Sequence, residues 1–152
     1  MVAIDTRERY PYRFAAHDVV TERAALPAGD YAVLAEGDPI ASVERKTLEN
    51  LAASLSDGTL AFQVQRLAEI PSAAVVVEGR YTAPFRSSTS PAHGSRTCWF
   101  ACTLRYPEVP VVFADSRRFA EELTYRFLAA ALAEAPERTS VRGPSGQAPR
   151  EG

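Results

Sequence analysis

The sequence predicts an α/β fold in which helices flank a mixed β-sheet. Runs typical of strands alternate with segments of helical period, and an early pair of runs indicates a hairpin. The runs 73–77 and 109–114 are apolar without alternation, which is typical of strands covered on both faces. The 152 residues suffice for one domain, which we assign to residues 1–135. Residues 136–152 are rich in Pro, Gly, Ser and Arg and are expected to form a disordered tail.

The first strands are expected near the N-terminus. Residues 2–5 form a short apolar run that ends in an acid, ahead of the loop formers Tyr10-Pro11-Tyr12. Residues 30–35 and 40–45 flank the turn Gly37-Asp38-Pro39. We expect these two runs to pair as an antiparallel hairpin.

The hairpin is expected to bring charged side chains together. In an antiparallel pair the start of the first strand lies beside the end of the second, so Asp30 and Glu44 should be neighbours. Because successive side chains of a strand point to opposite faces, Glu44 and Lys46 share a face and Arg45 points to the other. The pattern therefore predicts that Asp30, Glu44 and Lys46 converge on one point.

Helices and further strands follow the hairpin. Thr47 is the expected N-cap of a helical segment that is interrupted at Asp57-Gly58 and resumes as far as Ile70. The run 73–77 is expected inside the sheet and ends at Glu78.

The last third of the chain begins with residues 80–95, which we expect to form a mobile loop beside Glu78. We then predict a helix at 96–106, a buried-type strand at 109–114 and an amphipathic helix at 116–135. The apolar side of the last helix consists of Phe119, Leu123, Phe127, Leu128 and Leu132. That side exceeds what one small core needs, so we expect a homodimer that forms through it.

The composition narrows the class of protein. The chain is 46% hydrophobic and 24% charged, and no apolar run approaches the length of about 20 residues that spans a bilayer. The N-terminus lacks the pattern of a secretory signal, so we expect a cytoplasmic protein. The net charge of -2 indicates that any contact with nucleic acid is local. Lys46 is the single lysine among 17 basic residues, which indicates a role that arginine does not fill.

Cys98 and Cys102 lie four residues apart on a predicted helix and are expected to be buried side chains. The alternative is a zinc pair, for which His17 and His93 would have to supply the remaining ligands. Trp99 is expected in the core rather than as a platform on which a base stacks.

Two acids and a lysine at one point fit phosphodiester hydrolysis. Carboxylates can hold Mg²⁺ or Mn²⁺, which polarises the scissile phosphate and lowers the pKa of a bound water. Asp30 and Glu44 supply the carboxylates, and Lys46 would orient the water, offset charge or act as general base. The spacing alone also fits a solvated sheet edge with ordinary ion pairs.

A set of ordered blocks strengthens the interpretation as a nuclease. The blocks are Ile4-Asp5-Thr6-Arg7-Glu8, Gly29-Asp30-Tyr31, Val43-Glu44-Arg45-Lys46, Ser54-Leu55-Ser56-Asp57-Gly58, Gln63 with Arg66-Leu67, and Val77-Glu78-Gly79. Together, over residues 2–134, they resemble the nuclease domain of the XPF family, structure-specific endonucleases of DNA repair and recombination. The resemblance implies a restriction-endonuclease-like fold and a substrate of branched or flap DNA.

Carried over by position, the resemblance implies that Asp30 and Glu44 are metal ligands and that Arg45 and Lys46 are catalytic or contact phosphate. Asp5 and Glu8 would complete the acidic cluster, with Glu8 ligating the metal directly or through water. The alternative for these last two acids is a structural pair that holds Arg7 or Arg9.

The sequence departs from the family signature at two positions. Asn50 stands where the last Asp of the signature is expected, so a metal-water contact there would weaken. Thr59 stands where the family usually has a basic residue, which implies weaker binding of phosphate.

Other residues are expected around the site. Glu78 would support the metal ligands, with a helix cap or a solvated acid as the alternative. Gln63 and Arg66 lie three apart on one predicted helix and would face DNA, although a surface arginine often has no such role. Three arginines that border the 80–95 loop offer guanidinium groups for phosphate: Arg80, Arg86 and Arg96.

Members of the family usually carry a tandem helix-hairpin-helix module after the nuclease domain and act as dimers. Residues 136–152 offer no counterpart of that module, so we expect a stand-alone domain in which a dimer or a separate partner provides branch recognition, if it occurs. Two alternatives stay open: a catalytically silent DNA-binding or dimerisation module of the same fold, and a different metal-dependent hydrolase on that fold.

Overall fold

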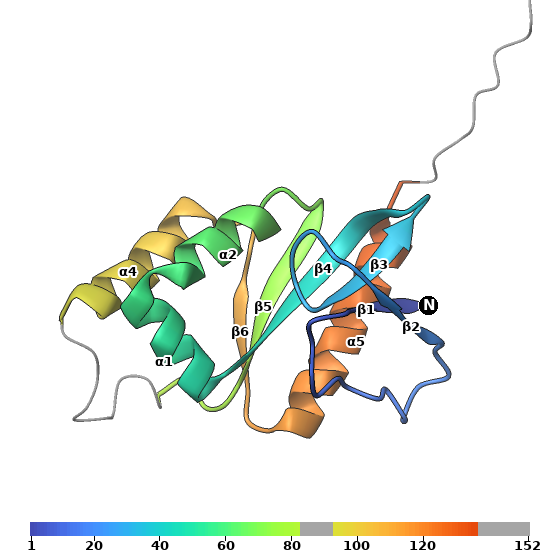
Figure 1. The fold of residues 1–152 in the computed structure, drawn as a ribbon, viewed down its shortest axis with the longest axis horizontal. Coiled ribbons are helices and arrows are strands. Elements are labelled where there is room, and N and C mark those ends of the chain that lie inside the picture. The colour runs from blue at the N-terminus through green and yellow to red at the C-terminus, as the bar shows by residue number, and fades with distance from the viewer. Residues whose placement is uncertain (83–92, 137–152) are drawn as a thin grey trace, which may run out of the picture.

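The computed structural model describes residues 1–82 and 93–136, with only the backbone for 93–98. Its described strands form one six-stranded mixed sheet in the order β2-β1-β3-β4-β5-β6 (Figure 1). Their bounds are β1 Val2–Asp5, β2 Thr21–Ala24, β3 Tyr31–Ala35, β4 Asp38–Thr47, β5 Ser72–Glu78 and β6 Val111–Ala114. β3 runs antiparallel to both β1 and β4, and the other neighbouring strands are parallel. The predicted mixed α/β sheet is confirmed.

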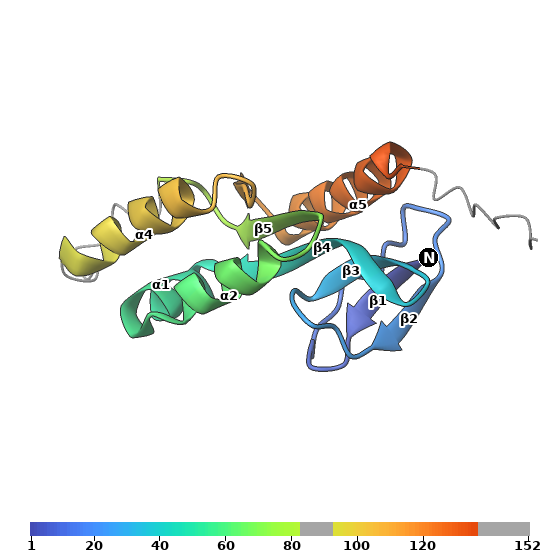
Figure 2. The same ribbon diagram turned by 90° about the horizontal axis from the view of Figure 1, so that it is seen from above.

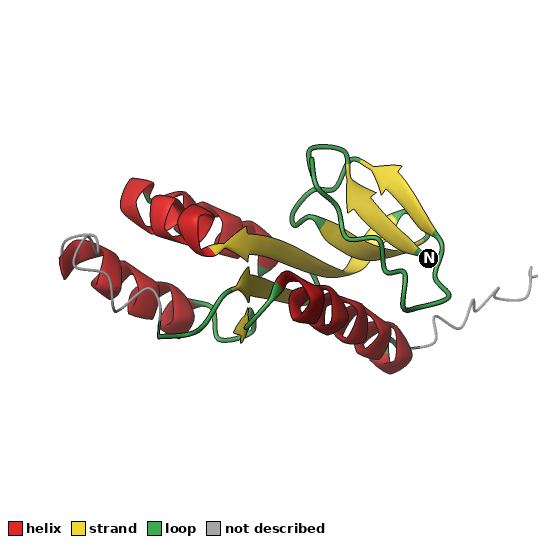
Figure 3. Cartoon of the chain, turned by 90° about the horizontal axis from the view of Figure 1, so that it is seen from below, coloured by secondary structure: helices red, strands yellow, loops and turns green. Residues whose placement is uncertain are grey.

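Helices cover both faces of the sheet (Figures 2 and 3). The described helices are α1 Leu48–Asp57, α2 Thr59–Leu67, α4 His93–Arg105 and α5 Arg117–Glu134. The interior strand β5 shows how the faces divide. Val75 and Val77 pack in one cluster with residues of α1, α2 and α4, whereas Val76 packs in another with residues of α5. This confirms that the unalternating run 73–77 belongs to a strand covered on both sides.

The predicted hairpin is present as β3 and β4, and its start depends on Gly29. Its turn consists of Glu36 and Gly37, whereas Asp38 and Pro39 of the predicted turn already belong to β4. Glu36 and Gly37 at the turn both have positive φ, 54° and 90°, as a tight hairpin turn requires. Gly29 has φ 81°, and a Cβ on it would overlap Ser42 Oγ and lie 3.1 Å from the Val43 carbonyl oxygen. Glycine therefore lets the chain press against β4 immediately before Asp30.

The α1 and α2 helices also match the pattern. Thr47 Oγ1 accepts a hydrogen bond from the Asn50 backbone N–H at 3.2 Å, as an N-cap does. Gly58, with φ 80°, separates the two helices where Asp57-Gly58 predicted an interruption. The second helix ends at Leu67, three residues before the predicted Ile70.

Several predictions differ from the structure. The strand β2 was not predicted, because its sequence is polar and largely exposed, without the apolar run or alternation typical of a strand. The run 109–114 forms the edge strand β6 with Val112 37% exposed, so its assignment as a buried-type strand is wrong. The helix α4 begins at His93, inside the predicted 80–95 loop. Most of that loop and, from residue 137 on, the predicted tail lie outside the described residues.

The remaining sequence questions concern single side chains. Trp99, 6% exposed, and Cys102 are buried as expected, while the side chain of Cys98 is outside the described part. His17 is bound to Glu122 at 2.6 Å and stacks on Tyr125 with ring centroids 3.5 Å apart. Within residues 1–82 and 93–136 no helix is both long and apolar enough to cross a membrane.

Candidate active site

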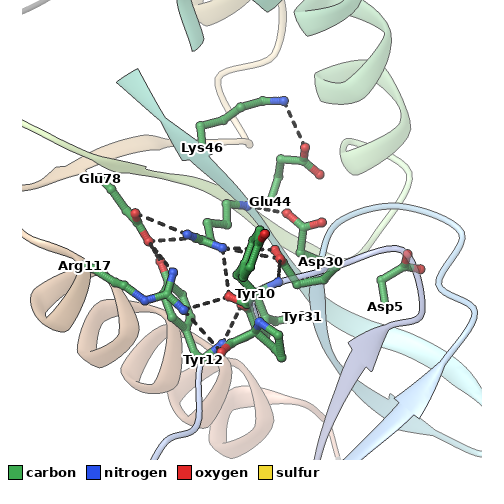
Figure 4. A network of polar contacts seen from close by, with 12 residues as sticks. Asp5, Tyr10, Tyr12, Asp30, Tyr31, Glu44, Lys46, Glu78 and Arg117 are labelled. Carbon is green, nitrogen blue, oxygen red and sulfur yellow. Dashed lines mark hydrogen bonds and ion pairs between the residues drawn. The ribbon is translucent and has the colours of Figure 1, made fainter. Parts of the chain in front are cut away.

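The predicted convergence of Asp30, Glu44 and Lys46 is present. The Asp30 N–H donates to the Val43 carbonyl oxygen at 2.8 Å, and Asp30 Oδ2 accepts from the Arg45 N–H at 2.8 Å. These two bonds hold the Asp30 carboxylate against β4 beside Glu44. Lys46 Nζ lies 3.1 Å from Glu44 Oε1, so both side chains point to the same face of the strand (Figure 4).

The three side chains open into a hollow of about 370 Å³, which we name the acidic hollow. Its lining is drawn from the loop after β1, from β4 and from the start of α1: Arg7, Glu8, Arg9, Tyr10, Asp30, Glu44, Arg45, Lys46, Thr47 and Asn50. Asn50 thus lines the same hollow as Asp30, Glu44 and Lys46. Because α1 begins directly after Lys46, one continuous segment contributes half of the site.

The charged side chains of the acidic hollow are more buried than ordinary surface charges. Glu44 is 9% and Lys46 5% exposed. Burial, and after it the neighbouring charge of Glu44, raises the pKa of Asp30 to about 7, although the hydrogen bond from the Arg45 N–H and the charge of Lys46 oppose the rise. Holding the two carboxylates together therefore costs free energy through burial and mutual repulsion, and a bound cation would remove this cost.

The donor set fits a hard divalent cation. Within the described residues, Asp30 Oδ1 and Glu44 Oε2 accept no hydrogen bond, so each acid has an oxygen available for a ligand. Carboxylate oxygens are the ligands that Mg²⁺ and Mn²⁺ take. The side chains described here do not, however, include a group of three or more His, Cys, Asp or Glu arranged to hold a metal.

Glu8, the third carboxylate predicted to bind the metal, is held by other partners. Its Oε1 accepts from the Tyr10 N–H at 2.8 Å, and its Oε2 lies 3.4 Å from Arg45 Nη1. The predicted ligand lines the acidic hollow but is bound to a cation and a backbone donor. It would have to leave Arg45 to reach a metal directly.

Arg45 lies on the opposite face of β4, as alternation predicts, and its side chain is only 12% exposed. Its Nε donates to Glu78 Oε1 at 2.7 Å and its Nη1 to the Tyr10 carbonyl oxygen at 3.1 Å, while the guanidinium carbon lies 5.2 Å from the Tyr12 ring centroid. These contacts raise the pKa of Arg45 above its ordinary value against the effect of burial. Arg45 is thus held in place by these partners, and it also contributes to the lining of the acidic hollow.

Glu78 is the centre of this polar network, which Figure 4 shows behind the acids. Besides Arg45 it accepts from the Tyr12 hydroxyl at 2.7 Å and lies 3.6 Å from Arg117 Nη1. Burial alone would raise the pKa of Glu78, but these donors hold it below its usual range. Glu78 is therefore neither a helix cap nor a solvated acid. It holds Arg45 on the face of β4 opposite to Glu44 and Lys46.

Asp5 does not join the hollow. It is 1% exposed, and its oxygens accept from the Arg7 Nε at 2.7 Å, the Arg7 N–H at 2.9 Å and the Leu26 N–H at 2.8 Å. Figure 4 shows its carboxylate apart from the acid pair. The structure corresponds to the alternative in which this acid holds Arg7.

A second hollow, of about 230 Å³, adjoins the same acids and is named here the α2 hollow. It is lined by Arg7, Ala28, Gly29, Asp30, Glu44, Gln63 and Arg66. The predicted pair on α2 therefore reaches the site: Arg66 Nη2 donates to the Pro27 carbonyl oxygen, and Gln63 lines the hollow beside the acids. Of the loop arginines, Arg80 is exposed, and Arg86 and the side chain of Arg96 lie outside the described residues.

Sequence reasoning missed Tyr12, Arg117 and Arg7 as parts of the site. Tyr12 and Arg117 reach Glu78 from segments more than a hundred residues apart, so no local pattern could have joined them. The signal for Arg7 was its place between Asp5 and Glu8 in the first block.

Comparison with known proteins places this geometry in context. Residues 4–127 match the ERCC4 domain. The fold is similar to the structure titled XPF from Aeropyrum pernix, complex with DNA, at 27% identity and TM-score 0.69, covering 93% of this chain and 68% of that one. A second structure, XPF from Aeropyrum pernix, is similar at 25% identity and TM-score 0.69, covering 99% of this chain and 68% of that one. No curated protein matches the sequence.

Proposed function

The chain belongs to the ERCC4 domain family, and we propose that it is a divalent-metal-dependent endonuclease that hydrolyses phosphodiester bonds in branched or flap DNA during repair or recombination. The observation that carries the proposal is the joint opening of Asp30, Glu44 and Lys46 into the acidic hollow. A silent member of the fold would have no need to keep two repelling carboxylates and a buried lysine together.

The proposed cofactor is Mg²⁺ or Mn²⁺, held by Asp30 and Glu44. When bound, such an ion polarises the scissile phosphate and makes a water molecule easier to deprotonate. The acids contribute by presenting one oxygen each to the hollow, while their other oxygens are fixed by the Arg45 N–H and by Lys46. Glu8 would join them after leaving Arg45.

Lys46 is proposed to act as a cation rather than as a general base. Its ammonium lies 3.1 Å from Glu44 Oε1, and this ion pair aims its N–H donors toward the hollow. From there the ammonium can orient the attacking water and offset charge on the phosphate in the transition state.

The proposed partner is DNA. One of the similar structures is titled as a complex with DNA. On this chain Arg80 and Arg66 are exposed, and Arg66 can donate to phosphate through the N–H groups that it does not use for the Pro27 carbonyl oxygen. Gln63 was expected to contact DNA with them, and its position beside the acids supports a more direct role. Association with DNA inside the cell is part of the same proposal.

Cleavage of labelled flap, fork and duplex substrates tests the proposal. With Mg²⁺ or Mn²⁺ the wild type should cut branched substrates, and Glu44→Ala should abolish cutting. Lys46→Arg should cut at least about a hundredfold more slowly, because the larger guanidinium cannot replace a compact ammonium. Undiminished cutting by Glu44→Ala would rule the mechanism out.

The alternative is a catalytically silent DNA-binding or dimerisation module. Asn50, in place of a charged ligand at the edge of the acidic hollow, is the observation that favours it. Such a module would bind branched DNA without cutting it at any concentration of Mg²⁺ or Mn²⁺.

A further inference from the structure

Gln63 carries a buried polar atom without a partner. Its amide oxygen is inaccessible to solvent and accepts no hydrogen bond from the part of the chain that the structure describes. Buried acceptors are nearly always paired, because an unpaired one loses the hydrogen bonds that water gave it in the unfolded chain. An orphaned oxygen in a polar hollow therefore indicates a donor or a cation that belongs there.

The surroundings of the oxygen identify the kind of ligand. Gln63 lines the α2 hollow together with Asp30 and Glu44, so its side chain borders the space that the two carboxylates also line. The two cationic residues of the hollow are already engaged. Arg7 donates to Asp5 and to the Leu26 carbonyl oxygen, and Arg66 donates to the Pro27 carbonyl oxygen.

The helix that carries Gln63 is fixed relative to the acids. Leu60, Val64 and Leu67 bury the other side of α2 in the core that contains Val75 and Val77 of β5. The bond from Arg66 ties the helix to the segment that leads into Gly29 and Asp30. The amide oxygen thus belongs to the rigid frame of the site rather than to a surface side chain.

We propose that Gln63 contributes its amide oxygen as a neutral ligand to the divalent-cation site formed by Asp30 and Glu44. This inference rests on the proposed function. Hard cations take six or more oxygen ligands and accept amide carbonyls beside carboxylates. Gln63 therefore adds a ligand without adding to the repulsion between the acids. It also lines a different hollow beside the acids from the one that Asn50 lines, where the signature carboxylate is replaced.

The test measures Mn²⁺ binding by titration calorimetry and the melting temperature in EDTA, both with the full chain. Gln63→Met keeps the length of the side chain and removes the oxygen. We expect a higher melting temperature in EDTA, because the orphaned acceptor is gone, and a Mn²⁺ affinity about tenfold weaker. Gln65→Met is the matched control: it changes the same residue type on the exposed side of α2 and should alter neither quantity.

Gln63→Glu is a second variant, for which we expect changes of melting temperature and Mn²⁺ affinity opposite to those of Gln63→Met. A third carboxylate should lower the melting temperature in EDTA through repulsion and bind Mn²⁺ at least as tightly as the wild type. A role limited to packing or to contact with DNA would leave Mn²⁺ affinity unchanged in both variants.

The outcomes separate the two proposals. If Glu44→Ala abolishes Mn²⁺ binding but Gln63→Met binds as tightly as the wild type, the role of Gln63 is overturned and the cation site stands. Weaker binding by Gln63→Glu would also overturn it. A wild type that binds no Mn²⁺ would overturn the inference and the proposed metal-dependent function together.

Discussion

Asp30 combines a structural cost with a proposed function. Its pKa of about 7 in the folded chain, raised by burial and then by Glu44, lies above the value of about 3.9 in an unfolded chain. The folded protein therefore holds a proton that the unfolded chain releases between these values. The stability that this group contributes is complete below the unfolded pKa and is lost as the pH rises through the folded pKa.

We predict that the cation-free wild type loses stability between about pH 5 and about pH 8, and that Asp30→Asn loses less. The difference amounts to about 1.4 kcal/mol for each pH unit between pH 5 and the folded pKa. Urea unfolding in EDTA at both pH values measures it. Asp38→Asn, at an exposed acid that begins β4, is the control. Equal losses in wild type and Asp30→Asn would contradict the account.

Asn50 is the residue at which the chain departs from the signature. It lines the acidic hollow in the first turn of α1, where the helix dipole also favours a negative charge. We predict that Asn50→Asp binds Mn²⁺ about tenfold more tightly, since another carboxylate joins the ligands. Ala53→Asp adds the same charge to an exposed position of α1 and should have no effect on affinity. No gain in Asn50→Asp would show that position 50 is too far from the cation to matter.

At the scale of elements, Glu78 links β5 to β4, to α5 and to the loop after β1. Replacing it with Gln leaves the buried Arg45 without its nearest counter-charge, so we predict a loss of about 3–5 kcal/mol of stability. Tyr12→Phe removes one hydrogen bond to Glu78 and should cost about 1 kcal/mol. Urea unfolding at neutral pH measures both losses.

Glu69→Gln is the control, because Glu69 is an exposed acid after α2 and its replacement should have little effect. The lowered pKa of Glu78 adds a dependence on acid: its contribution is present above the unfolded pKa and is lost as the pH falls through the folded pKa. If Glu78→Gln were as stable as Tyr12→Phe, the network would not be an ionic one.

At the scale of the whole molecule, the predicted apolar side of α5 is only partly used by the core. Ala120, Thr124 and Leu128 are buried, whereas Phe119 is 49% and Leu132 51% exposed. We predict a homodimer that buries these two side chains, and Phe119→Glu with Leu132→Glu should dissociate it.

Light scattering over a range of concentrations gives the mass. Phe62→Glu, at a side chain of α2 that is 71% exposed, is the matched control and should leave the dimer intact. A wild type that scatters as a monomer at every concentration would contradict the prediction.

The sequence by itself determined what depends on neighbours along the chain. Alternation in β4 separated Glu44 and Lys46 from Arg45, and antiparallel pairing across a short turn placed Asp30 beside them. The same local rules placed Thr47 as the cap of α1 and Gly58 at its end. These features follow from strand and helix geometry, which the identity of nearby residues fixes.

Only the tertiary structure decided which partners the charged and polar groups take across the fold. In the folded chain Arg45 pairs with Glu78 and Asp5 pairs with Arg7. Glu8 pairs with Arg45 and does not join Asp30 and Glu44 as a third ligand. The tertiary structure also paired the polar strand β2 with β1 and placed Gln63 beside the acids. Such contacts join distant segments, and each depends on the burial and competition of groups that no local pattern ranks.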